Sequence, residues 1–218
     1  MFDFSPQALL QRGLFVIVLL LSLAVHEFAH AWSAWRLGDD TAARMGRLTL
    51  NPFAHADPFG TFLLPLLGIP FGWARPVPVN PARFRRDVRM GMGMALTASA
   101  GPISNLVLAT LGTTVLALLR RFAPGAVEYG AGGRELLEIF VYLNVNLAIF
   151  NLIPVPPLDG SRVVDGLVPT RLRPAWEQVT ALAPFLLIAV FFFAGRLIAG
   201  PSAFVLELLD QLARAIGA

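Results

Sequence analysis

The sequence of 218 residues has no cysteine and no lysine, and only 14% of its residues are charged. Without cysteine the chain forms no disulfide framework, no thiolate metal site and no cysteine nucleophile. The charged fraction is far below the roughly 25% of a soluble domain, which argues against a disordered chain, a nucleic-acid-binding module and an ordinary soluble enzyme. We therefore expect no nucleic-acid partner.

Apolar residues dominate the composition instead. The residues AVILMFWYC make up 56% of the chain, and there are 19 glycines in addition. The mean hydropathy is +0.66. This composition predicts an all-α polytopic membrane protein, built as a single membrane-embedded domain over residues 1–218 and surrounded by the lipid bilayer. Nothing in the sequence indicates an oligomeric state.

Four stretches contain the roughly 20 apolar residues that a helix needs to span a bilayer. They lie at about 13–35, within 90–119, at about 136–152 and at about 178–197. Residues 202–218 predict a separate amphipathic helix at the interface, because apolar side chains recur on one of its faces. These side chains are Phe204, Leu208, Leu212 and Ile216.

Residues 58–74 are also uncharged, but they predict a different structure. The run contains three prolines and three glycines, which together exclude a straight helix. We expect a re-entrant or interfacial segment, with short strands in the extended stretches 47–50 and 76–80. Irregular backbone at membrane depth must be buried in protein or line a wet cavity.

Arginine is distributed unevenly between the predicted spans. With four spans, the segments 36–89 and 162–173 lie on the same side of the membrane and hold 11 of the 17 arginines. The positive-inside rule places this side in the cytoplasm and both termini outside. We interpret the basic run from Arg83 to Arg89 as a solvated face near anionic lipid headgroups.

His26, Glu27 and His30 form the pattern H-E-x-x-H inside the first apolar stretch. The two histidines are four residues apart, so both imidazoles lie on one helix face and can bind one metal ion. Glu27 lies about 100° around the helix, where a general base for an attacking water is expected. Each ionisable side chain at mid-bilayer costs about 2.5–3.5 kcal/mol, and a bound divalent cation compensates that cost.

A catalytic zinc site needs a third protein ligand. Pro154, Pro156 and Pro157 prevent a regular helix after the third predicted span, and this unwound stretch ends at Asp159. Asp159 is therefore the predicted third ligand. The alternative is that Asp159 caps the helix that follows, although capping and ligation can coexist.

Three segments resemble the site-2 protease family of intramembrane zinc metalloproteases, peptidase family M50. They are HEFAH at 26–30, GPISN at 101–105 and NLIPVPPLDG at 151–160. The segments 46–52, 55–60 and 71–80 are similar to those of the short bacterial members, which have no PDZ or CBS domain. The resemblance extends from about residue 20 to about residue 165, which is most of the chain.

The resemblance implies one Zn²⁺ per chain, bound by His26, His30 and Asp159, with Glu27 activating the attacking water. It also implies that Asn151 lies near the active site and steadies the substrate backbone or the oxyanion. The alternative for Asn151 is a buried amide that caps the broken helix.

Two further polar residues are each open to two interpretations. Asn105 either lies near the site or packs and hydrogen-bonds within the bundle, and we favour the second role. His55 either lines the site or hydrogen-bonds the substrate, or else it caps a turn or faces water. We favour the structural role because histidine is often a satisfied hydrogen-bond partner.

The resemblance implies an endopeptidase that hydrolyses a peptide bond in or near a transmembrane segment of a membrane-protein substrate. Such an enzyme is expected in the bacterial plasma membrane as a multi-pass protein, with its active site nearer the cytoplasmic side. The rival functions are an inactive scaffold that binds membrane helices and a zinc carrier. Retention of Glu27 beside all three ligands argues against the scaffold, and the single polar cluster along the spans argues against the carrier.

Overall fold

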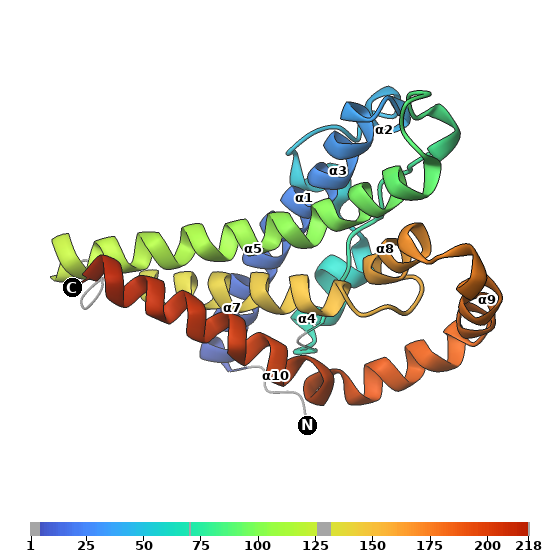
Figure 1. The fold of residues 1–218 in the computed structure, drawn as a ribbon. Helices are drawn as coiled ribbons and strands as arrows, with labels where there is room; N and C mark the ends of the chain where they lie inside the picture. The colour runs from blue at the N-terminus through green and yellow to red at the C-terminus, as the bar shows by residue number, and fades with distance from the viewer. Residues whose placement is uncertain (1–4, 70, 126–131, 218) are drawn as a thin grey trace.

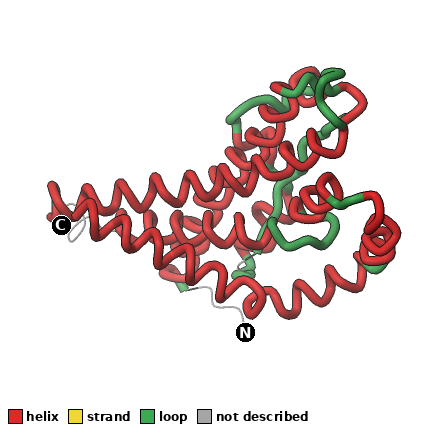
Figure 2. Tube along the Cα trace, in the orientation of Figure 1, coloured by secondary structure: helices red, strands yellow, loops and turns green. Residues whose placement is uncertain are grey.

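The computed structural model describes residues 5–69, 71–125 and 132–217. Within these ranges the chain is largely helical and has no strand (Figure 1 and Figure 2). The elements are α1 (Pro6–Arg36), α2 (Thr41–Arg44), α3 (Pro52–His55), η1 (Pro58–Leu63), α4 (Leu64–Leu66), η2 (Pro81–Arg83), α5 (Met90–Phe122), α7 (Gly133–Asn151), α8 (Asp159–Leu167), η3 (Thr170–Leu172), α9 (Arg173–Ala181) and α10 (Ala183–Gly217).

Helix α5 is the centre of the bundle, because it packs against α1, α7, α8 and α10. Figure 1 shows α5, α7 and the last part of α10 running side by side, with α1 crossing α5. The buried positions of α5 include small residues such as Gly93, Ala98 and Ala109. Small side chains let helix backbones approach closely in membrane bundles, which explains why so many elements meet on this helix.

Three of the four predicted spans are confirmed as helices long and apolar enough to cross a membrane. Among the described residues these helices are α1, α5 and α10. The fourth predicted span, 136–152, is the helix α7, whose first two turns carry three charged residues. The count of four spans therefore stays a prediction.

The C-terminal part of the chain differs from the prediction. One helix of 35 residues, α10, continues through Pro201 where we expected a span at 178–197 and a separate amphipathic helix at 202–218. The helix continues because its buried Leu209 packs in one apolar cluster with α5 and α7. This packing outweighs the hydrogen bond that Pro201 cannot donate.

The segment 58–74 is not a straight helix, as predicted. A π-helical turn, η1, leads into the short helix α4, and residues 71–80 then have no regular secondary structure. The prediction of short strands at 47–50 and 76–80 is wrong, since neither stretch forms a strand. Pro76 and Pro78 lack the N–H groups that a strand ladder requires.

Residues 71–80, called the strap below, are held by single hydrogen bonds to neighbouring elements. The Thr61 hydroxyl donates to the Trp73 carbonyl (2.9 Å), and Arg75 N donates to the His55 carbonyl (2.8 Å). Asn80 N donates to Asp39 Oδ2 (2.6 Å). These contacts fix the irregular backbone of the strap beside α1 without a sheet.

Candidate active site

Helix α1 carries the predicted zinc ligands on its buried side. His26, Glu27 and His30 are 4%, 7% and 7% exposed. One helical turn separates the two imidazoles, whose ring centroids are 4.6 Å apart. Their Nε2 atoms are 3.0 Å apart and therefore face the same point.

Asp159 reaches this point from the far end of the sequence. After α7 ends at Asn151, the proline-containing stretch leads to α8, whose first residue is Asp159. Asp159 Oδ2 lies 3.2 Å from Nε2 of His26 and 3.2 Å from Nε2 of His30. The cap of α8 is Leu158, with no side-chain cap hydrogen bond, so the capping alternative for Asp159 is wrong.

Two glycines allow α8 to bring its first residue so close. A Cβ atom on Gly160 would clash with the Leu152 carbonyl at the end of α7. A Cβ atom on Gly166 would clash with the Gly91 carbonyl of α5. Larger side chains at these positions would move α8 away from its neighbours and carry Asp159 with it.

The hydrogen bonds of the two imidazoles leave the Nε2 atoms free to bind a metal. His30 Nδ1 lies 2.7 Å from the Thr97 carbonyl, and His26 Nδ1 lies 2.5 Å from Asn105 Oδ1. Because both partners are acceptors, each neutral ring carries its proton on Nδ1 and directs the lone pair of Nε2 toward Asp159.

Asp159 Oδ2 is buried and has no hydrogen-bond partner among the described residues. Burial raises the pKa of the Asp159 carboxyl, but the interactions with the adjacent His26 and His30 imidazoles lower that pKa below its ordinary value overall. The group is therefore an anionic carboxylate at neutral pH. Two nitrogen lone pairs and one anionic oxygen thus converge, and a cation at their centre satisfies all three.

Gly101 of α5 keeps the space around these atoms open. A Cβ atom at this position would clash with His30 Nε2 and lie only 2.6 Å from His26 Nε2. In the described part of the chain, His26, His30 and Asp159 offer ligand atoms that all lie within 4.8 Å of one another. Two imidazoles and a carboxylate are a known donor set of catalytic zinc, so the residues fit this metal.

Glu27 lies beside the cluster and is held by the strap. Val77 N donates to Glu27 Oε2 at 2.8 Å, which fixes the carboxylate through one of its two oxygens. Arg47 anchors the same strap, since its Nη2 donates to the Arg75 carbonyl (2.5 Å). Burial lowers the pKa of Arg47, while the Glu27 carboxylate raises it and Arg75 lowers it further.

Comparison with known proteins supports the same chemistry. The sequence pattern of Peptidase family M50 matches residues 126–194. The Bacillus subtilis protein named "Putative zinc metalloprotease YwhC" is 43% identical over 177 residues, which cover 81% of this chain and 78% of the relative. The Mycolicibacterium smegmatis protein named "Putative zinc metalloprotease Rip2" is 34% identical over 187 residues, covering 82% of this chain and 67% of the relative.

The chain belongs to peptidase family M50. It is a zinc metalloprotease, and its metal is Zn²⁺. No solved structure matches the chain in the same kind of comparison.

A cavity of about 870 Å³ adjoins the metal cluster of this M50 protease, called the site cavity below. His26, Glu27, His30, Asp159 and Asn151 line it, together with apolar side chains from α1, α7, α10 and the strap. The cavity is therefore large enough for several side chains of an extended peptide, and its walls are mostly apolar.

Three aromatic rings from distant parts of the chain meet on the wall of the site cavity. Phe71 of the strap packs edge-on against Phe150 of α7 and Phe191 of α10, with ring centroids 5.6 and 4.8 Å apart. The strap and α10 thus share an apolar contact across the cavity wall.

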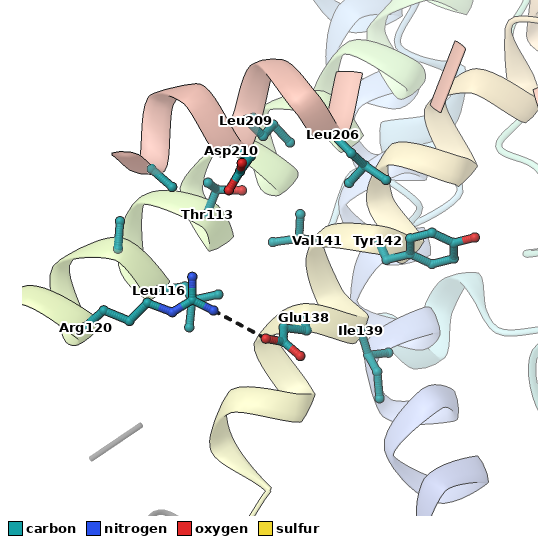
Figure 3. A pocket seen from close by; sticks show the side chains of 12 residues that line it. Thr113, Leu116, Arg120, Glu138, Ile139, Val141, Tyr142, Leu206, Leu209 and Asp210 are labelled. Carbon is teal, nitrogen blue, oxygen red and sulfur yellow. Dashed lines mark hydrogen bonds and ion pairs between the residues drawn. The ribbon is translucent and has the colours of Figure 1, made fainter. Parts of the chain in front are cut away.

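A second cleft of about 490 Å³ lies between α5, α7 and α10 (Figure 3). Figure 3 shows Arg120 of α5 reaching toward Glu138 of α7, and these side chains are 3.4 Å apart. The second cleft shares no lining residue with the site cavity and contains no histidine. It does not resemble a metal site.

The structure gives the remaining candidates from the sequence different positions relative to the site. Asn151 lines the site cavity, but its Nδ2 donates to the Leu147 carbonyl of the same helix (2.9 Å). His55 is buried away from the site cavity, and its Nε2 lies 2.8 Å from the Thr49 carbonyl, in agreement with the structural role that we favoured. Asn105 has a hydrogen-bonding role, as favoured, but its partner is the candidate ligand His26.

Sequence reasoning missed two residues connected to the site, Ser22 and Asn144. Both are fully buried, and Asn144 Nδ2 donates to the Ser22 hydroxyl at 2.9 Å. The sequence does contain an indication of both residues, since Asn144 is a polar residue within an apolar stretch and Ser22 precedes His26 by about one helical turn. Which polar residue of α7 faces α5 depends on the packing of the helices.

Proposed function

We propose that this M50 metalloprotease is an intramembrane endopeptidase that hydrolyses a peptide bond in or near a transmembrane segment of a membrane protein, as in regulated intramembrane proteolysis. The observation that supports this proposal most strongly is the convergence of His26, His30 and Asp159 on the buried side of an apolar helix. A zinc site at this place acts on a peptide that enters the bundle.

In this proposal the three converging residues are the zinc ligands and Glu27 is the general base. Bound zinc supplies a Lewis acid that polarises the scissile carbonyl and makes water more acidic. Glu27 takes the proton of the attacking water with the carboxylate oxygen that Val77 does not hold. The same carboxyl then returns the proton to the leaving amine, so that the base is regenerated.

Asn151 is proposed as a second catalytic residue, which steadies the substrate backbone or the oxyanion. Its place on the wall of the site cavity supports this role. Because its Nδ2 already donates to the Leu147 carbonyl, the amide must share or exchange this bond when substrate is present.

The proposed setting is the plasma membrane of a bacterium, with α7 as a fourth span and residues 58–74 as a re-entrant or interfacial segment. Exposed Phe59, Leu63 and Leu66 on this segment support contact with lipid. The excess of arginine in 36–89 and 162–173 supports a cytoplasmic position for the active-site end.

The substrate must present an exposed peptide bond, because a helix uses its backbone groups internally. We therefore propose that the substrate segment unwinds before cleavage and lies extended in the site cavity. The strap lines this cavity and offers irregular backbone against which an extended peptide can bind.

The test is a cleavage assay with purified protein and a model transmembrane substrate, combined with a measurement of zinc per chain. We expect Glu27→Gln to keep one zinc while cleavage falls about 10²–10⁴-fold. The matched control is Glu177→Gln, which removes an exposed carboxylate of α9 and should behave as wild type. Zinc binding without Glu27-dependent cleavage would instead favour the scaffold, and zinc flux into vesicles would favour the carrier.

A further inference from the structure

A chain of buried hydrogen bonds connects His26 to two asparagines on neighbouring helices. Asn105 of α5 contacts His26 Nδ1 through its Oδ1 (2.5 Å) and donates from its Nδ2 to Asn144 Oδ1 (2.8 Å). Asn144 of α7 donates from its Nδ2 to Ser22 of α1 (2.9 Å) and to the Phe140 carbonyl (2.9 Å). Both asparagines and Ser22 are 0% exposed.

The Phe140 carbonyl determines the direction of every bond in this chain. A carbonyl only accepts, so the NH₂ group of Asn144 must face it and Asn144 Oδ1 must face Asn105. Asn105 must then donate to Asn144, which leaves Asn105 Oδ1 to face the imidazole. His26 Nδ1 is therefore the donor, and Nε2 keeps its lone pair.

The two histidines reach the same tautomer by different means. His30 Nδ1 lies 2.7 Å from the backbone carbonyl of Thr97, an acceptor that no side-chain substitution removes. His26 depends on two side-chain amides, of which Asn144 does not contact His26 itself. A substitution at Asn144 therefore affects one histidine and leaves the other as an internal reference.

We infer that Asn105 and Asn144 are positioning residues that hold His26 as the Nδ1–H tautomer and thereby present its Nε2 to zinc. The inference rests on the proposed function, because it takes His26 as a zinc ligand. Outer partners that fix the tautomer and orientation of a ligand histidine commonly change metal affinity or activity by 10–100-fold when they are removed.

Removal of the Asn144 amide has a specific consequence for His26. Without an acceptor for its Nδ2, the Asn105 amide is free to rotate and to offer an N–H to His26 Nδ1. His26 Nδ1 then accepts, and the ring proton moves to Nε2, the atom that faces Asp159. A proton on this atom competes with zinc.

The experiment uses zinc-loaded full-length protein in detergent, with ¹⁵N in the histidine rings. It measures the rate of zinc loss to a chelator and the Nδ1–H resonances of His26 and His30. We expect Asn144→Leu to lose zinc about 10–100-fold faster and to weaken or shift the His26 resonance, while the His30 resonance stays in place. Asn144→Asp, as a neutral buried acid, keeps an oxygen for Asn105 and an O–H for the Phe140 carbonyl, so it should restore most of the wild-type behaviour.

Two further variants keep the test independent of a folding defect. Thr113→Val removes a buried hydroxyl from α5 outside this hydrogen-bond chain and should leave zinc loss unchanged. Asn105→Asp retains an acceptor for His26 although it replaces the amide that donates to Asn144, so we expect His26 to stay the Nδ1–H tautomer and its resonance to move downfield.

The possible failures are distinguishable. If His26→Ala retains zinc as wild type does, the proposed ligand set is wrong. If His26→Ala loses zinc while Asn144→Leu keeps the wild-type rate and the wild-type His26 resonance, the ligand set holds and the positioning role is wrong. If Asn144→Leu does not fold, a wild-type His26 resonance in Asn105→Asp overturns the inference.

Discussion

The site cavity and the second cleft both lie along α5, α7 and α10, yet their polar groups are arranged in opposite ways. In the site cavity, α1 and α8 add His26, His30 and Asp159, whose side chains are only 5%, 9% and 14% exposed. In the second cleft, Arg120 and Glu138 form an ion pair whose side chains are each 46% exposed.

The difference shows in which of the two places the polar groups are energetically unfavourable without a further partner. An exposed ion pair adds little to the stability of the fold and costs little desolvation energy, because water still solvates both partners. Buried nitrogen and oxygen atoms that face one another are unfavourable unless something satisfies them. The site cavity is therefore the place where a bound cation changes the energy of the fold, and the second cleft is not.

The largest expected effect comes from removing the carboxylate that completes the cluster. Asp159→Ala leaves two imidazoles from one helix, which are too few for a catalytic zinc site. We expect the purified variant to contain little zinc and to show no detectable cleavage. Metal analysis and the cleavage assay check both points, and a variant that keeps one zinc per chain would contradict the assignment.

Asn151→Ala tests whether the wall of the site cavity takes part in the reaction. If Asn151 stabilises the oxyanion, kcat should fall about 10²-fold with KM little changed. If the amide only caps the end of α7, the melting temperature should fall while kcat stays near the wild-type value. Steady-state kinetics together with thermal unfolding separate the two roles.

Gly101→Ala tests the space that the cluster requires. The added Cβ would collide with both imidazoles, so we expect zinc affinity to fall about 10-fold or more. Gly112→Ala is the matched control on the same helix, because its Cβ would meet the ring of Phe140 instead. Equal zinc affinities for the two variants, measured by chelator competition, would count against a metal beside Gly101.

The smallest effect is expected in the second cleft. Glu138→Gln breaks exposed ion pairs with Arg120 and Arg134. We expect zinc content to be unchanged, the cleavage rate to change by less than about twofold and the melting temperature to change by at most about 2–4 °C. A loss of zinc in this variant would show that the second cleft and the site cavity are energetically coupled.

The spacing of residues was sufficient to predict the cluster but not its surroundings. The four-residue separation of His26 and His30 is local, and the prolines before Asp159 exclude a helix whatever the rest of the chain does. The partnership of Asn105 with Asn144 depends on how α5 and α7 pack, which no local pattern specifies.

Two errors have the same origin in long-range packing. Residues 76–80 of the strap looked like a strand because the sequence there is extended, but Pro76 and Pro78 cannot complete a ladder, and the side chains of Glu27 and Asp39 hold this backbone instead. Helix α10 continues past Pro201 because its apolar face has partners on α5 and α7. In both cases contacts made elsewhere in the fold decided the local structure.

X-ray absorption at the zinc edge of the purified protein tests the central claim most directly. The account predicts one zinc per chain, with two imidazole nitrogens and oxygen ligands at about 2.0–2.2 Å and no sulfur. It also predicts that the imidazole contribution falls in His26→Ala. A zinc shell without imidazole, or a spectrum that His26→Ala leaves unchanged, would contradict the assignment of His26, His30 and Asp159 as the metal site.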